Sequence, residues 1–371
     1  MKPLNLNATL LSLMMLIFTV SCNDDIKEPT LPQNIVPQKF TVDIPPSLTS
    51  TASNGRVNGR TSDDELNGGE IYELLGAFIL IAEFSGDVIE EIMGAISTFG
   101  LNQATIISYQ SDDDGRTKNL EVVEGVTFES VSYAYQLTIT DADSESNADG
   151  GKAMQIFWNT DPVQGVAILK PFNIDRVTDA NAGDAVYRID YSEVASQDYE
   201  AHMTVTISGL PLANPLDDPY AIDNLKMFVG KNGEVVDVYG NSNHPNASFF
   251  TTDAGFSWAF VASGIDNSDI GVAEVGLPPN NLNTTDRAVI MEDYSIKNVF
   301  TEQILAVWPN IEQSQLDAFL FNTEAPGYFN EEGFIQGGTS PGPEFDPLAT
   351  RIQDLVPFNP SEINDLQIQF K

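Results

Sequence analysis

The feature that most limits the possible folds is a long region, residues 104–276, in which apolar and polar residues alternate. The clearest runs are residues 133–139, 201–207 and 256–260, and such alternation is typical of strands that bury one face. Turn-forming clusters separate the runs, and Asn232-Gly233 suits the two positive φ angles of a type I′ hairpin turn. Because no helical pattern intervenes, we predict an antiparallel meander of about ten strands.

A different pattern precedes the meander, in residues 69–99, where apolar residues recur every three or four positions. This spacing predicts one long hydrophobic helix. Glu73 and Glu83 bracket only nine uncharged residues. A membrane span needs about 20, so we expect the helix to be buried in protein. The predicted fold is therefore α+β and mainly β, with the meander forming a half-barrel or open barrel that packs on this N-terminal helix. Two sandwich domains are the rival architecture.

The region after the meander, residues 277–371, combines loops with shorter patterns. Residues 299–308 and 314–321 predict two short helices. Alternation over residues 366–370 predicts a last strand, and residues 39–44, before the long helix, predict another short strand.

The first 21 residues have the pattern of an export signal, with Lys2 before a 13-residue apolar stretch at positions 8–20. This stretch runs into Cys22, the only cysteine, which Asn23-Asp24-Asp25 follow. The segment resembles the start of Bacteroidetes-type outer-membrane lipoproteins. The resemblance implies a lipid on Cys22, anchoring in the outer membrane and display at the cell surface, and it implies nothing about the fold. An ordinary secretory signal with an incidental cysteine is the alternative.

We expect three parts along the chain: a signal peptide over residues 1–21, a lipidated cysteine with a flexible tether over 22–67, and a single α+β domain over 68–371. The tether contains prolines among polar residues and then a polar stretch with too few apolar groups to order itself.

The charge of the chain excludes one class of partner. There are 17 Lys and Arg against 54 Asp and Glu, a formal net charge of −37. Nucleic acids would be repelled, because their binding needs clustered cations. The single cysteine also excludes an internal disulfide framework.

The densest acidic cluster has oxygen-bearing side chains at alternate positions: Asp141, Asp143, Glu145, Asn147 and Asp149. Alternating oxygen ligands are what a calcium loop needs, so these residues form a candidate calcium site. The cluster lacks the Gly and Glu that complete an EF-hand, and a solvated hairpin loop is the competing interpretation.

No catalytic group stands out. His202 falls on the polar side of its predicted strand, and His244 precedes a proline in a polar segment. The match of residues 338–342 to G-x-S-x-G is interpreted as a turn, because Pro341 lacks the backbone N–H that an oxyanion hole would use. We favour a core position for Trp258 and leave Trp158 and Trp308 open.

Three functions remain open on this sequence. The first is a surface-exposed or periplasm-facing lipoprotein that acts as a non-catalytic binding or assembly module, with an outer-membrane protein, a glycan or a lipid as partner. The second is a carrier that holds a lipid or another apolar ligand in a half-barrel cavity. The third is a glycan hydrolase whose carboxylate pair the sequence does not locate.

Overall fold

The computed structural model describes residues 35–37, 39–50, 68–98, 105–111, 114–176, 183, 185–212, 221–247 and 255–371. Cys22, the signal peptide and most of the predicted tether lie outside these residues. Within them, no helix is both long enough and apolar enough to span a bilayer.

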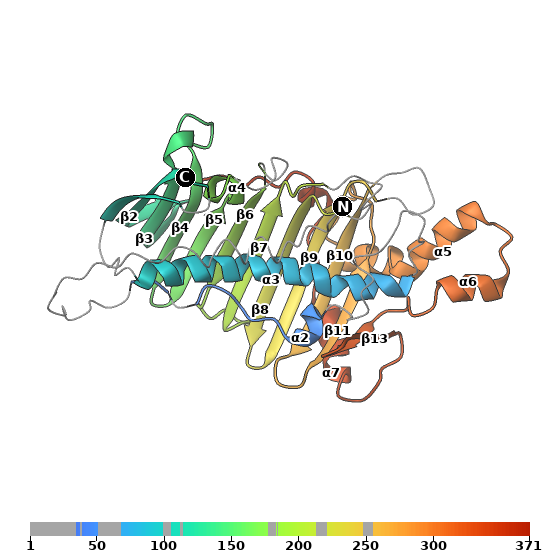
Figure 1. The fold of residues 1–371 in the computed structure, drawn as a ribbon. Helices are drawn as coiled ribbons and strands as arrows, with labels where there is room; N and C mark the ends of the chain where they lie inside the picture. The colour runs from blue at the N-terminus through green and yellow to red at the C-terminus, as the bar shows by residue number, and fades with distance from the viewer. Residues whose placement is uncertain are drawn as a thin grey trace.

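The described chain is mainly β, and its strands form one antiparallel meander in which every strand pairs with its neighbours in sequence (Figure 1). The sheet is not closed, because β1 and β13 pair with only one strand each. These findings confirm the predicted antiparallel meander. The thirteen strands are β1 Thr105–Gln110, β2 Thr117–Phe128, β3 Val131–Asp141, β4 Lys152–Thr160, β5 Val163–Leu169, β6 Val186–Ser192, β7 Ala201–Ser208, β8 Asn224–Asn232, β9 Val235–His244, β10 Phe256–Ile265, β11 Ile270–Gly276, β12 Gly327–Asn330 and β13 Gly333–Gly337.

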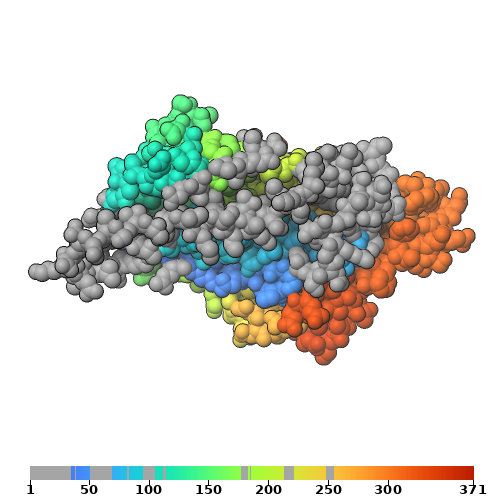
Figure 2. Space-filling model, viewed as in Figure 1, coloured from blue at the N-terminus to red at the C-terminus, as the bar shows by residue number. Residues whose placement is uncertain are grey.

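Helices complete the described structure. They are α2 Pro46–Thr49, α3 Gly68–Thr98, α4 Pro171–Ile174, α5 Ile296–Val307, α6 Gln313–Phe319, α7 Asp346–Arg351 and α8 Pro360–Ile363, with 3-10 turns at Ala142–Ser144 and Ile352–Asp354 and a π-helical segment at Ala288–Asp293. The helices α5 and α6 project from one end of the molecule (Figure 1, Figure 2).

The hairpin between β8 and β9 forms as predicted, but its turn type differs from the prediction. Asn232 pairs with Val235, so the two loop residues are Gly233 and Glu234. Only the glycine of this turn has a positive φ, +60°. A positive φ at the first loop position is the pattern of a type II′ turn.

The helix α3 crosses one face of the sheet, which we call the inner face (Figure 1). Its buried side chains belong to the main core together with the inward side chains of the strands. Phe78, for example, packs edge-on against Trp258 of β10, with 4.6 Å between ring centroids. Trp258 therefore lies in the core, as favoured from the sequence.

The apolar side chains of residues 39–44 also belong to this core, but the segment forms no strand, and the predicted strand is wrong. Phe40, Val42 and Ile44 are buried as the alternation indicated. Side chains of α3 take the place of a neighbouring strand: Glu90 accepts the backbone N–H of Phe40 at 2.6 Å, and Glu83 accepts that of Ile44 at 3.3 Å.

The opposite, outer face of the sheet is covered by other parts of the chain in two places. An apolar cluster at β9–β12 packs under α7 and the residues around it, and a second cluster at β2–β5 packs under Ile368 and Phe370. Residues 364–371 are not a strand, so that prediction is wrong as well. They cross the sheet and bond to its side chains: Ser208 donates to the carbonyl of Leu366 at 3.0 Å.

Candidate functional site

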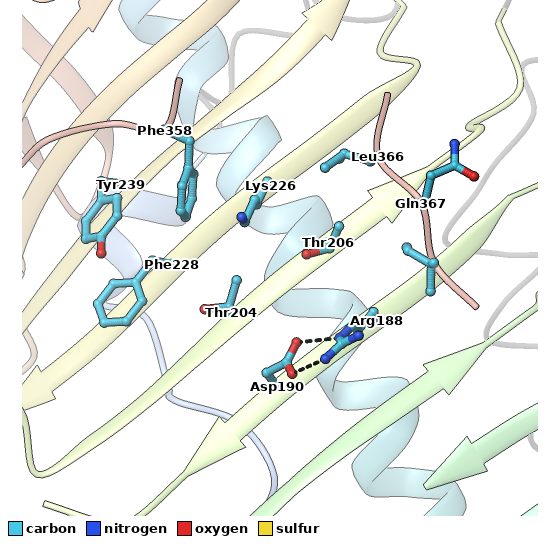
Figure 3. Close-up of a pocket in the computed structure, with 11 residues that line it drawn as sticks. Arg188, Asp190, Thr204, Thr206, Lys226, Phe228, Tyr239, Phe358, Leu366 and Gln367 are labelled. Carbon is cyan, nitrogen blue, oxygen red and sulfur yellow. Dashed lines mark hydrogen bonds and ion pairs between the residues drawn. The ribbon is translucent and has the colours of Figure 1, made fainter. Parts of the chain in front are cut away.

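A groove opens on the outer face between these two covered regions, over strands β6 to β9 (Figure 3). Its volume is about 470 Å³. We call it the outer groove. Its floor consists of Arg188, Asp190, Thr204, Thr206, Lys226, Phe228 and Tyr239, and its rim consists of Phe358, Leu366, Gln367 and Ile368.

The floor residues are alternate positions of adjacent strands, so their side chains point to the same face. The register of the sheet arranges them in two rows across the strands. One row, which we call the basic row, consists of Arg188, Thr206 and Lys226. The other, the aromatic row, consists of Asp190, Thr204, Phe228 and Tyr239.

Two features bound the groove. On the side of the basic row, residues 364–371 cross the sheet and are held there by two hydrogen bonds. Ser208 donates to the carbonyl of Leu366, and the amide of Asn224 donates to the carbonyl of Asn364 at 3.2 Å. On the side of the aromatic row, the Tyr199 ring lies over Gly230. A Cβ at Gly230 would come within 2.5 Å of that ring, so only glycine leaves room for it.

Arg188 is held firmly at one end of the basic row. Its guanidinium donates to both carboxylate oxygens of Asp190 and to both of Glu129, at 2.7–2.8 Å. Burial by itself would lower the pKa of Arg188, but these hydrogen bonds raise it overall. Its donors are thus largely committed within the protein.

Lys226 occupies the other end of the basic row. Its ammonium nitrogen lies 4.3 Å from the centroid of the Phe358 ring, a cation–π geometry. Figure 3 shows the lysine between Phe358 and the threonines of the floor.

His202 of β7 lies beside the aromatic row. Phe228 stacks on Tyr239 with 4.7 Å between centroids and on His202 with 5.9 Å. His202 is partly buried, and burial lowers its pKa, which favours the neutral ring. The histidine is therefore part of an aromatic stack, although its place on the polar side of the strand suggested a solvated surface group.

A second groove lies elsewhere, beside Arg287 and Lys297, and contains three glutamates. Two of these carboxylates are tightly paired: Glu274 bonds to Arg287, and Glu324 bonds to Lys297. The third, Glu292, lies 4.0 Å from Arg287. Since each carboxylate already has a cation, this groove offers less to a ligand than the outer groove does.

The five residues of the candidate calcium loop lie near one end of β3 and β4, and two of their carboxylates are bound by cations. Asp141 is fully buried and accepts from Arg116 at 2.9 Å, and Asp149 accepts from Lys170 at 2.8 Å. Burial would raise the pKa of both carboxyl groups, but these hydrogen bonds lower it overall. Among the described residues, no group of three or more His, Cys, Asp or Glu is arranged to hold a metal ion.

The other three residues of that loop, Asp143, Glu145 and Asn147, are exposed. The side chain of Glu145 accepts from Asn119 at 3.3 Å, while the backbone N–H of Asp143 donates to Asp141. Asn147 contributes its backbone N–H to a turn closed by Ser144. Calcium binding by Asp141, Asp143, Glu145, Asn147 and Asp149 stays a prediction.

Other residues singled out in the sequence have structural positions. His244 is not in a polar loop: it is fully buried at the end of β9, 2.7 Å from the Ser242 hydroxyl. Residues 338–342 form bends after β13, and the Ser340 hydroxyl donates to the carbonyl of Gly342. Trp158 is buried, whereas Trp308, at the end of α5, is 40% exposed.

The comparisons with known proteins give no match. No protein-family model, no curated protein and no solved structure matches the chain.

The outer groove was not predicted from the sequence. The sequence does contain its floor residues as pairs two positions apart, with charged, hydroxyl or aromatic side chains: Arg188 and Asp190, Thr204 and Thr206, Lys226 and Phe228. Each pair by itself is an ordinary polar strand face. Only the register places the pairs side by side.

Proposed function

We propose that the protein is a lipid-anchored protein of the outer membrane that binds a ligand, without catalysis, in the outer groove. The anchor rests on Cys22 and the acidic residues after it. The binding site rests on one observation: the chain's own segments cover the outer face on both sides, and the groove between them has charged, hydroxyl and aromatic side chains in register.

The packing of α3 favours this function over that of a lipid carrier. A carrier would need an apolar cavity between helix and sheet. Instead, Leu75, Ile79 and Ile89 of α3 are at most 1% exposed and contribute to the same core as the inward faces of the strands. We propose that this packing is the principal core of the domain.

The state of the groove's carboxylate also argues against a glycan hydrolase. Hydrolysis by the usual mechanisms needs two carboxyl groups, one of them free to give a proton. Among the described residues, Asp190 is the carboxylate that lines the groove, and both of its oxygens accept from Arg188.

The experiment compares the parent protein with Thr204→Trp, which fills the middle of the groove floor. Melting temperatures are measured against a panel of oligosaccharides, peptides and phospholipids, because a ligand that binds only the folded state raises the melting temperature. We expect at least one compound to stabilise the parent and not the variant. Thr127→Trp, on strand β2 outside the groove, is the matched control and should respond like the parent.

Two results would contradict the proposal. A phospholipid that stabilises parent and Thr204→Trp equally would favour the carrier. Turnover of an oligosaccharide by the parent, lost in Asp190→Asn, would favour the hydrolase.

A further inference from the structure

Lys226 differs from the other cationic side chains of this acidic protein. Every other Lys and Arg side chain in the described part of the chain donates a hydrogen bond to an oxygen atom of the protein. The ammonium of Lys226 has no such acceptor among these residues, and its contact is with the face of Phe358. With a net charge of −37, the chain has an excess of carboxylates that could have paired with it.

The position of this ammonium makes it available to a ligand. Lys226 is partly buried and lines the groove beside Thr206, its partner across the strands, while Thr204 and Phe228 form the adjacent pair. In Figure 3 its end points into the space between Phe358 and the threonines. A charge held in a partly enclosed groove interacts more strongly with an anion than one in open water does.

The number of free donors indicates a carboxylate as the anionic group. Phosphate groups are usually held by several donors at once, such as arginine forks or clustered backbone N–H groups. Arg188, the arginine that lines this groove in the described part of the chain, already donates to Asp190 and Glu129. A single free ammonium matches the single charge of a carboxylate.

The rest of the floor indicates a ligand rich in hydroxyl groups. Strands β6 to β9 each pair on both sides, so their backbones cannot add an extended peptide as a further strand. The polar groups of the floor that remain are the hydroxyls of Thr204, Thr206 and Tyr239, which can both donate and accept. The rings of Phe228 and Tyr239 supply apolar surface next to them.

We propose that the outer groove binds a hexuronic-acid residue of an acidic oligosaccharide. The carboxylate of the sugar pairs with the Lys226 ammonium, its hydroxyls bond to Thr204 and Thr206, and its apolar face contacts Phe228 and Tyr239. This inference rests on the proposed function, since it names the ligand class of the same groove.

The test measures binding by calorimetry with trigalacturonate, with the corresponding neutral galactose trimer and with a glutamate-containing hexapeptide. The variants are Lys226→Met, which keeps the length of the side chain but removes its charge, and Lys231→Met as the control. Lys231 lies on the same strand, outside the groove, and pairs with Asp266. Melting curves of both variants establish that they are folded.

We expect trigalacturonate to bind the parent more tightly than the neutral trimer does, and Lys226→Met to weaken it by about ten- to hundredfold, the range for a hydrogen bond to a charged group. Lys231→Met should bind like the parent. Added salt should weaken binding to the parent and have less effect on Lys226→Met.

Three results would overturn the inference. The first is that the parent binds the charged and the neutral trimer with equal affinity and that Lys226→Met does not change either affinity. The groove would then bind saccharides without selecting acidic ones. Binding of the hexapeptide alone, lost in Lys226→Met, would keep the anionic subsite and replace the sugar by a peptide. If none of the three probes binds, a uronic acid is excluded as the ligand. The ligand panel with Thr204→Trp would then still decide whether the groove binds a ligand of another class.

Discussion

Arg351 on α7 forms a bidentate ion pair with Asp237 on β9, although the two residues are 114 positions apart. The Asp237 side chain is 1% exposed, and it also accepts from the hydroxyls of Ser263 and Tyr199. This pair joins the C-terminal helices to the outer face of the sheet, and it supports the tyrosine that bounds the outer groove.

Removing one partner should therefore be more harmful than removing both charges. We expect Arg351→Met to lower the free energy of unfolding by about 3 kcal/mol, because it leaves a buried carboxylate without its cation. The double variant with Asp237→Asn should recover part of this loss. Urea unfolding of the single and double variants measures the effect, and additive losses would show that the two side chains are energetically independent.

Glycines of α3 differ in what lies next to them, which gives a matched pair of substitutions. A Cβ at Gly76 would come 2.6 Å from the carbonyl oxygen of Ser50, whereas a Cβ at Gly94 would meet nothing within 4 Å. We expect Gly94→Ala to stabilise the protein by up to about 1 kcal/mol through helix propensity. Gly76→Ala should destabilise it, because the backbone at Ser50 must move. Thermal unfolding of both variants checks this, and equal shifts would contradict the close approach.

The stability should depend on pH through Glu83. Burial raises the pKa of this carboxyl group to about 7, with Asp87 and Asp43 adding to the shift and the N–H of Ile44 opposing it. The folded state thus binds a proton that the unfolded state has released, so stability falls as the pH rises from about 4.5 to about 7. Glu83→Gln should flatten this part of the profile and raise the melting temperature at pH 8.

The matched control for that profile is Glu91→Gln, which changes an exposed residue of the same helix. The whole chain is acidic, so general repulsion also weakens the folded state at higher pH. Each neutral substitution removes a similar share of that repulsion. Identical pH profiles for the two variants would remove Glu83 as the cause.

Cys22 should decide where the protein is found in the cell. We expect the parent to partition with outer membranes and to have a lipid on Cys22, and Cys22→Ala to give a folded protein released from the membrane. Mass spectrometry of the mature N-terminus and fractionation measure both. A free thiol on membrane-associated parent protein would contradict the anchor.

A truncation that also removes Phe40 and Ile44 should unfold the domain, because these residues lie in the main core.

The sequence by itself determined the class of the fold. A period of two over residues 104–276, with turn-forming clusters and no helical pattern between the runs, leaves few arrangements besides an antiparallel meander, since short connections make neighbours in sequence neighbours in the sheet. It also determined which side chains of a strand share a face. Val205 and Ile207 are buried, and Thr204 lies on the outer side.

Only the tertiary structure decided what each part of the outer face does. The alternation that predicted a strand at residues 366–370 reported burial correctly for Ile368 and Phe370, which pack on a cluster of the outer face. It could not tell a strand from a segment that crosses the sheet and bonds to side chains, because both bury alternate residues.

The same limit applies to the groove. Arg188 and Lys226 lie 38 positions apart, and they belong to one row only because β6, β7 and β8 pair in a particular register. Whether that row is covered or open depends on where distant segments such as residues 364–371 pack. Local pattern is a property of neighbouring residues, whereas a binding site is made by contacts between segments that the pattern does not relate.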